Sequence, residues 1–251
     1  RRPRSSPPPP SAPFFPDAAR GVQRLRRPDN AVRRCFTRHG TIAKVRGPGG
    51  REKHVRTSEL TREIDESPAG PHIAALFDLD RTLIAGFSAL TFVVDGFRSG
   101  RLGASDLGEL LFAATSFQLG TVGFSGFLSG TARTLRGFSE EEFAAVGERI
   151  FNEELASEVY PEARAIVDAH RRKGHTIAIV SSATRYQVAP IARELGIEHV
   201  LVSSLEVQNG QLTGELVYPL CYGEGKALFA RGLADELGLD LSQSWFYTDS
   251  E

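Results

Sequence analysis

The stretch IAALFDLDRTLIAG, residues 73–86, is the most informative part of this chain. Its mostly apolar start, Ile73 to Phe77, predicts a short buried strand. Two aspartates, Asp78 and Asp80, follow with one residue between them. A strand gives side chains at its end a rigid platform, and in parallel sheets ligands bind just beyond the carboxyl ends of strands. The stretch therefore predicts a site built on a sheet edge.

Strands and helices alternate along the chain that follows. Buried runs at 175–184, 199–204 and 244–249 predict strands, and helical spacing marks 160–174, 186–196 and 223–240. Asn209-Gly210, between two alternating runs, predicts a hairpin. Strands that alternate with helices of this length indicate an α/β fold with a Rossmann-like, mostly parallel sheet.

The block at about 87–158 predicts an all-helical insertion after the first strand of this sheet. Its clearest helix lies in residues 138–155, where Ser139 is placed to cap the helix and three glutamates suit its positive N-terminal end. The apolar residues of this helix share one face: Phe143, Val146, Ile150 and Phe151.

Outside the insertion, before the first predicted strand, a short helix is expected at 58–64, with Ser58 as its cap.

One part of the insertion raises the question of a membrane span. Residues 110–132 carry no charge, and about 20 apolar residues suffice to cross a bilayer. The stretch also contains seven Ser, Thr and Gln residues and four glycines, which hydrocarbon solvates poorly. We therefore expect buried helices of a soluble subdomain.

Charge divides the chain of 251 residues into two parts. Residues 1–56 hold 15 Lys and Arg against 3 Asp and Glu, whereas residues 57–251 hold 15 against 28. The first part begins with seven prolines in sixteen residues and stays basic without sustained periodicity. We expect this segment to be disordered, or translated from upstream of a true start near Val55, and the domain to occupy 57–251. A nucleic-acid-binding or membrane-binding arm is the alternative.

Two cysteines, Cys35 and Cys221, provide no disulfide framework. Free thiols are typical of a reducing cytoplasm. Residues 1–20 contain no apolar core of a secretory signal. We therefore expect a cytoplasmic protein.

Chemically useful side chains gather at the predicted strand ends. The first strand supplies Asp78 and Asp80, the second Ser181, and the last Asp249, while Lys226 starts the preceding helix. Three carboxylates at one edge would repel one another without a counterion, and hard oxygen ligands suit Mg²⁺. A hydroxyl and an ammonium suit phosphate oxygens.

This set predicts phosphoryl transfer. One carboxylate can attack phosphorus and form an aspartyl-phosphate, and a second, two residues on, can handle the leaving-group proton. Each signal alone has a structural explanation, since acids after strands cap helices and surface lysines are common. Their order and spacing carry the prediction.

The sequences FDLDRTL, IVSSAT, GEGKALF and WFYTDS resemble the four motifs of the haloacid dehalogenase superfamily, in its phosphoserine-phosphatase-like branch (subfamily IB), over about residues 72–251. The resemblance implies that Asp78 is the nucleophile and Asp80 the general acid/base. It also implies that Asp78, the backbone carbonyl of Asp80, and Asp249 hold Mg²⁺, and that Ser181 and Lys226 bind phosphate. The helical insertion would be a cap that closes over the site.

Two departures from the family pattern stand out. Arg81 occupies a position where many relatives have a small residue; it points outward or reaches the substrate or the cap. The sequence ends at Glu251, before the position where these families usually place another aspartate, so we expect the chain as written to bind Mg²⁺ weakly.

The resemblance implies a Mg²⁺-dependent phosphomonoesterase acting on a small phosphorylated metabolite, for which a phosphoserine-like compound is one candidate, and no nucleic acid partner is expected. Four cap arginines are candidates for contacting the substrate: Arg98, Arg101, Arg133 and Arg136. The uncharged run around 112–127 could instead line an apolar pocket. An alternative is that residues 72–251 form the phosphatase-like half of a bacterial protein that continues into a lysophosphatidate acyltransferase domain, which would place the complete protein at a membrane.

Overall fold

The computed structural model describes residues 32–36, 43–46, 52–55, 57–121 and 123–249. Its sheet has eight strands in the order β3-β2-β1-β8-β4-β5-β6-β7. The centre is parallel and consists of β8 (Trp245–Tyr247), β4 (Ala74–Phe77), β5 (Thr176–Thr184) and β6 (His199–Gln208). The predicted α/β fold with a mostly parallel sheet is confirmed.

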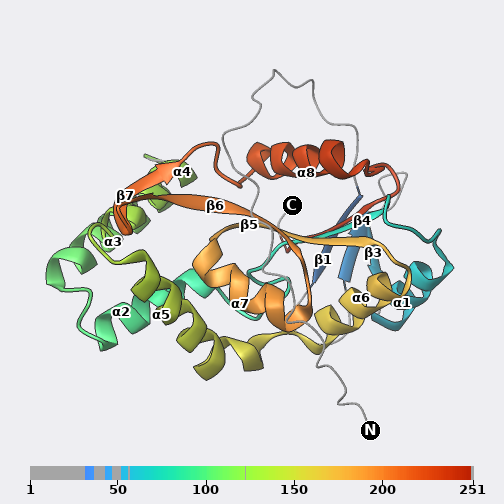
Figure 1. The fold of residues 1–251 in the computed structure, drawn as a ribbon, viewed down its shortest axis with the longest axis horizontal. Coiled ribbons are helices and arrows are strands. Elements are labelled where there is room, and N and C mark those ends of the chain that lie inside the picture. The colour runs from blue at the N-terminus through green and yellow to red at the C-terminus, as the bar shows by residue number, and fades with distance from the viewer. Residues whose placement is uncertain (1–31, 37–42, 47–51, 56, 122, 250–251) are drawn as a thin grey trace, which may run out of the picture.

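Strand β4 is apolar throughout because helices cover both faces of the sheet. Successive side chains of a strand point to opposite faces, so Phe77 packs on one side and Leu76 on the other. Figure 1 shows α6 (Pro161–Arg172) and α7 (Arg185–Leu195) on one face and α8 (Glu224–Leu237) on the opposite face. The result is a three-layer arrangement.

Helix α1 (Thr57–Glu66) packs against α6 and buries Leu60 and Ile64. The predicted cap of this helix is wrong. Ser58 lies within α1, one residue after its first residue, because the helix begins at Thr57.

The predicted hairpin is confirmed as β6 and β7 (Gln211–Val217). Asn209 and Gly210 have φ values of +51° and +75°. Two consecutive residues with positive φ form the turn whose twist matches that of the flanking strands, and Asn-Gly accepts this geometry most readily.

The cap, residues 88–158, lies between β4 and β5 and consists of helices, as predicted. Its elements are α2 (Ser88–Arg98), α3 (Ala104–Gln118), α4 (Phe124–Arg133), α5 (Glu140–Glu153) and the 3₁₀ helix η1 (Leu155–Glu158). Ser139 accepts a hydrogen bond from the Glu142 backbone N–H at 3.4 Å, and the four predicted core residues of α5 are all buried. Helix α5 packs on α7, which joins the cap to the core.

The expectation that residues 110–132 form buried helices is wrong in part. Two helices do occupy this stretch, but α3 packs mainly on α4, which leaves one face of α3 uncovered. Leu111, Phe112 and Leu119 are exposed, with Phe112 at 75%. None of the helices in the described part of the chain is long and apolar enough to cross a bilayer.

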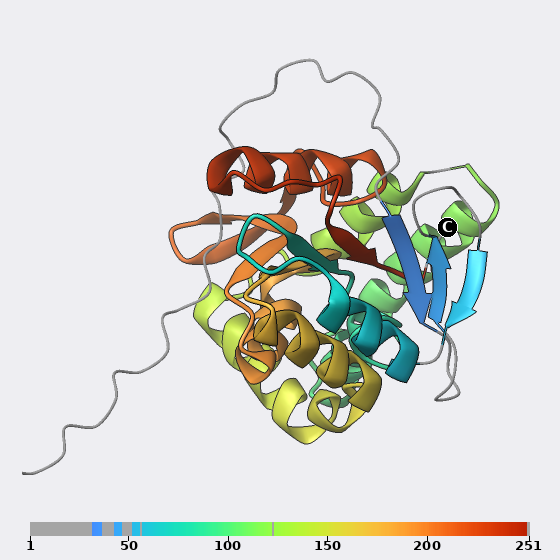
Figure 2. The same ribbon diagram turned by 90° about the vertical axis from the view of Figure 1, so that its right-hand side faces the viewer.

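The sequence predicted no regular structure for residues 1–56, but three short strands lie there. They are β1 (Val32–Phe36), β2 (Ala43–Arg46) and β3 (Glu52–Val55), and β1 pairs in parallel with β8. Figure 2 shows them continuing the sheet beyond β8. Backbone pairing to an open strand edge needs no apolar periodicity, so the sequence pattern gave no sign of it. The remainder of the segment, including its proline-rich start, lies outside the described residues.

A buried histidine pair lies behind the sheet on the α6 side. His175 Nε2 lies 2.8 Å from the Pro68 carbonyl oxygen, His175 Nδ1 lies 2.8 Å from His170 Nδ1, and His170 Nε2 lies 2.7 Å from the Tyr247 hydroxyl. A carbonyl only accepts, so His175 Nε2 carries hydrogen and its neutral Nδ1 accepts from His170. In this arrangement His175 is neutral, and both of its ring nitrogens have a hydrogen-bond partner.

Burial lowers the pKa of His175 below its ordinary value. The unfolded chain therefore takes up a proton more readily than the folded one as pH falls through about 6.5, so the stability that neutral His175 contributes is full above that pH and is lost below it. We expect the free energy of unfolding to fall as the pH is lowered from 7 to 5. The fall should be larger in the unmodified protein than in His175→Gln, by up to about 1 kcal/mol. Urea unfolding across this range measures the difference. Parallel pH profiles would contradict this assignment.

Candidate active site

Asp78 lies at the carboxyl end of β4 and is mostly buried. Its backbone N–H donates to the Tyr247 carbonyl oxygen at 2.9 Å, which extends the parallel pairing of β4 with β8 by one residue. Its Oδ1 accepts from the Leu79 N–H at 2.8 Å. The Asp78 carboxylate is therefore fixed relative to two strands of the sheet.

Lys226 reaches this carboxylate from the first turn of α8. Its ammonium forms an ion pair and hydrogen bond with Asp78 Oδ2, across 148 positions of sequence, and both side chains are mostly buried. The chain before α8 approaches the helix closely: a Cβ on Gly225 would overlap the carbonyl oxygen of Leu220. Gly225, the second glycine of GEGK, thus allows α8 to begin where Lys226 contacts Asp78.

Asp80 lies between β4 and the cap, two residues after Asp78. Its Oδ1 accepts from the Ser88 backbone N–H at 2.7 Å, and the Ser88 hydroxyl also acts on the pKa of this carboxyl group. Burial raises the pKa of Asp80, the charge of Asp78 raises it further, and the Ser88 hydrogen bonds oppose this. A carboxyl that holds its proton more readily suits a general acid.

Asp249 follows β8 and pairs with Arg81, whose Nε lies 3.2 Å from Asp249 Oδ2. Burial raises the pKa of Asp249, Arg81 lowers it, and the nearby charge of Asp78 raises it. Arg81 has a φ of +58° and its guanidinium lies 5.6 Å from the centre of the Phe87 ring. The sequence left two roles open for Arg81: pointing outward, or reaching the substrate or the cap. Neither role includes this ion pair with Asp249, a predicted metal ligand.

Ser181 lies at the same sheet edge. Phe77 of β4 is level with Ile179 of β5, so Ser181 follows two residues beyond, and the pairing of β5 with β6 shifts between Ser181 and Thr184. The Ser181 hydroxyl is buried and accepts from the Ala183 N–H at 3.3 Å.

Sequence reasoning missed Cys221, for which it expected only a free thiol. The thiol is fully buried and donates to the Leu201 carbonyl oxygen at 3.3 Å. Burial raises the pKa of this thiol to about 12. The charge of Lys226 and the Ser181 backbone lower the pKa, and the charge of Asp78 raises it. Cys221 therefore stays a neutral thiol among the predicted site residues.

These donors fit a Mg²⁺ ion. In the described part of the chain, no three His, Cys, Asp or Glu side chains cluster as an all-side-chain metal site. The resemblance requires only two carboxylates and a backbone carbonyl, with waters and a phosphate oxygen completing the shell. Asp249 lies close enough to Asp78 that the charge of Asp78 raises the pKa of Asp249, which is the arrangement a divalent cation relieves.

Three of the four candidate cap arginines form ion pairs with carboxylates of the chain. Arg98 pairs with Glu154, Arg101 with Asp95, and Arg136 with Glu215, while Arg133 is exposed at the end of α4. Phe112 projects to solvent and does not line an apolar pocket.

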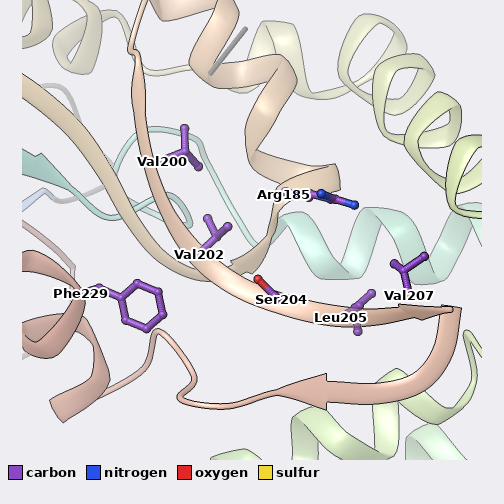
Figure 3. A pocket seen from close by; sticks show the side chains of 7 residues that line it. All are labelled: Arg185, Val200, Val202, Ser204, Leu205, Val207 and Phe229. Carbon is purple, nitrogen blue, oxygen red and sulfur yellow. The ribbon is translucent and has the colours of Figure 1, made fainter. Parts of the chain in front are cut away.

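A cavity of about 220 Å³ lies beside β6 and contains none of the predicted site residues. Figure 3 shows its lining, with Arg185 contributed by the start of α7 and Phe229 by α8.

A family model described as haloacid dehalogenase-like hydrolase matches residues 75–251. The chain belongs to this family. The haloacid dehalogenase-like fold and the motif resemblance are thereby confirmed. The match spans the strand end with Asp78, the Ser181 strand, Lys226 and Asp249.

Several curated relatives of this hydrolase carry phosphatase names. A probable phosphatase from Mycobacterium tuberculosis is 31% identical over 180 residues, covering 70% of this chain and 62% of the relative. A phosphoserine phosphatase from the same organism is 32% identical over 181 residues, covering 70% and 59%. The chain thus spans about 60% of the length of these relatives.

The fold of this haloacid dehalogenase-like hydrolase is also that of a crystal structure from Bordetella pertussis whose function is unknown. The two share a TM-score of 0.63 at 24% identity, covering 70% of this chain and 81% of that one. At this identity the match establishes the fold alone.

Proposed function

We propose that the protein is a Mg²⁺-dependent phosphomonoesterase that acts on a small phosphorylated metabolite through an aspartyl-phosphate on Asp78. The observation that carries this is the contact between Lys226 and the Asp78 carboxylate, which brings two predicted motifs together at the sheet edge. The phosphatase names of the relatives support the same reaction.

In this mechanism a carboxylate oxygen of Asp78 attacks phosphorus, and the bond from phosphorus to the ester oxygen breaks. Asp80 gives its proton to the departing oxygen, and then takes a proton from the water that hydrolyses the acyl phosphate. Lys226 and Ser181 bind the phosphate oxygens, where the ammonium offsets their negative charge. Mg²⁺, held by Asp78, Asp249 and the Asp80 carbonyl, would neutralise charge on the transferring group.

The substrate class is proposed from the relatives rather than from the cap. A phosphoserine-like metabolite agrees with the name of one relative. No observation on the described residues favours the acyltransferase alternative, and we propose neither a nucleic-acid nor a membrane partner.

The test uses the full-length protein. It is assayed with Mg²⁺ against a panel of phosphate monoesters, and acid-quenched turnover samples are digested and analysed by mass spectrometry. We expect hydrolysis of at least one ester and a phosphoryl adduct on the peptide that contains Asp78. Hydrolysis with the adduct on another residue would overturn the aspartyl-phosphate assignment.

Metal removal gives a separate expected result. Treatment with a chelator should reduce hydrolysis by at least about 100-fold, because Asp78 and Asp249 would then repel the substrate phosphate, and added Mg²⁺ should restore the rate. Thermal unfolding under both conditions distinguishes loss of chemistry from loss of fold. Full activity in the chelated protein would contradict the proposed cofactor.

A further inference from the structure

Ser88 is the first residue of α2 and is fully buried. The first backbone N–H groups of a helix lack partners within the helix, and the N-cap residue here, Phe87, provides no side-chain cap. The Asp80 carboxylate fills this role from eight positions earlier, accepting from the Ser88 N–H at 2.7 Å. The first helix of the cap is therefore tied to the candidate general acid.

Gln187 fixes the other side of Ser88. Its Oε1 accepts from the Thr184 backbone N–H at 2.8 Å and from the Thr184 hydroxyl at 2.9 Å, as part of a capping box at the start of α7. A backbone N–H only donates, so this contact assigns the amide oxygen to Thr184 and the amide nitrogen to the opposite side. The Gln187 Nε2 then donates to the Ser88 hydroxyl oxygen at 3.1 Å.

The direction of each hydrogen bond follows from this assignment. Because Gln187 donates to the Ser88 hydroxyl oxygen, the single hydroxyl hydrogen of Ser88 is free to point to the Asp80 carboxylate. Gln187 and Ser88 are mostly or fully buried, so water competes little for these bonds.

We propose that Gln187 and Ser88 are positioning residues that hold the Asp80 carboxyl group in the orientation from which it protonates the leaving group. This inference rests on the proposed phosphatase function. The Ser88 N–H occupies Oδ1 of Asp80, so Oδ2 is the oxygen that this proposal assigns to the ester oxygen. Gln187 also belongs to the capping box of α7, the helix that follows the strand with Ser181. Its bond to Ser88 therefore fixes the position of Asp80 relative to that strand.

The most informative variant is Gln187→Glu. The introduced carboxylate still accepts from Thr184 and keeps the capping box, but it presents an oxygen to Ser88 in place of the amide donor. The Ser88 hydroxyl then donates to this carboxylate and no longer to Asp80. Ser88→Ala removes the hydroxyl and keeps the backbone N–H bond to Asp80. Gln211→Glu, on the exposed start of β7, is the matched control for the added charge.

The readout is kcat/KM of the full-length protein for two esters of similar shape, phenyl phosphate and p-nitrophenyl phosphate. Phenolate leaves poorly without a proton, whereas p-nitrophenolate leaves readily as an anion, so loss of general acid catalysis affects the first far more. We expect Gln187→Glu and Ser88→Ala each to reduce kcat/KM by about 10-fold for phenyl phosphate and by less than about 3-fold for p-nitrophenyl phosphate. The double variant should be no slower than Ser88→Ala, since both changes act through one hydroxyl.

Equal losses for the two esters, no loss for either, or fully additive effects in the double variant would each overturn the positioning role. These results are distinct from failure of the proposed function, in which the unmodified protein hydrolyses neither ester or Asp78→Asn retains full activity. Thermal unfolding of each variant beside Gln211→Glu identifies any loss that comes from the fold, which would lower kcat/KM equally for both esters.

Discussion

Asp78→Asn is expected to reduce kcat/KM for phosphate ester hydrolysis by at least about 10³-fold. Asparagine has nearly the same shape as aspartate, but its amide is a very poor nucleophile toward phosphorus. The change also leaves the mostly buried Lys226 ammonium without its carboxylate partner and removes one of the two proposed metal-binding carboxylates. Three contributions are therefore lost together: nucleophile, lysine orientation and metal affinity.

The measurement compares steady-state hydrolysis with acyl-phosphate formation in the same samples. Asp240→Asn is the control, because Asp240 is a partly exposed carboxylate that accepts hydrogen bonds from its chain neighbours Ser242 and Gln243, away from the sheet edge. We expect this control to retain full activity. Turnover by Asp78→Asn at the unmodified rate would eliminate covalent catalysis on this residue.

Much of the sheet edge could be predicted from the sequence because buried strands leave a strong signal. The apolar run before Asp78 and the run before Ser181 each place their polar residues at a strand end, and parallel strands end at the same edge. Lys226 could be added only from its position after the hairpin and from the motif resemblance. Its contact with Asp78 confirms that the two lie together.

Other features of the site leave no such signal. The bonds from Gln187 to Ser88 and from Arg81 to Asp249 join residues 99 and 168 positions apart, and neither pair has a pattern that single-sequence periodicity can detect. The burial of Cys221 depends on how the chain packs after β7. The exposure of α3 has no sequence signal because an uncharged run need not be buried, since apolar atoms make up much of any protein surface.

Gly225→Ala is expected to destabilise the protein by about 3 kcal/mol and to reduce activity by about 100-fold. The added methyl group would overlap the Leu220 carbonyl oxygen, a backbone atom that cannot rotate away. Either the loop at 220–222 or the first turn of α8 must shift. Since Lys226 is the next residue, a shift of α8 moves its ammonium away from Asp78, and a displacement of about 1 Å is enough to weaken the contact substantially.

Gly232→Ala is the matched control for Gly225→Ala, because both glycines lie in α8 and a Cβ on Gly232 would meet no atom within 4 Å. Alanine favours the helix over glycine by up to about 1 kcal/mol, so we expect Gly232→Ala to be as stable as the unmodified protein or slightly more stable, with unchanged kcat/KM. Urea unfolding and ester hydrolysis measure both effects in the two variants. If Gly225→Ala matched Gly232→Ala in both measurements, the close approach of Leu220 would not be what sets the position of Lys226, and the contact that carries the proposed function would need another structural cause.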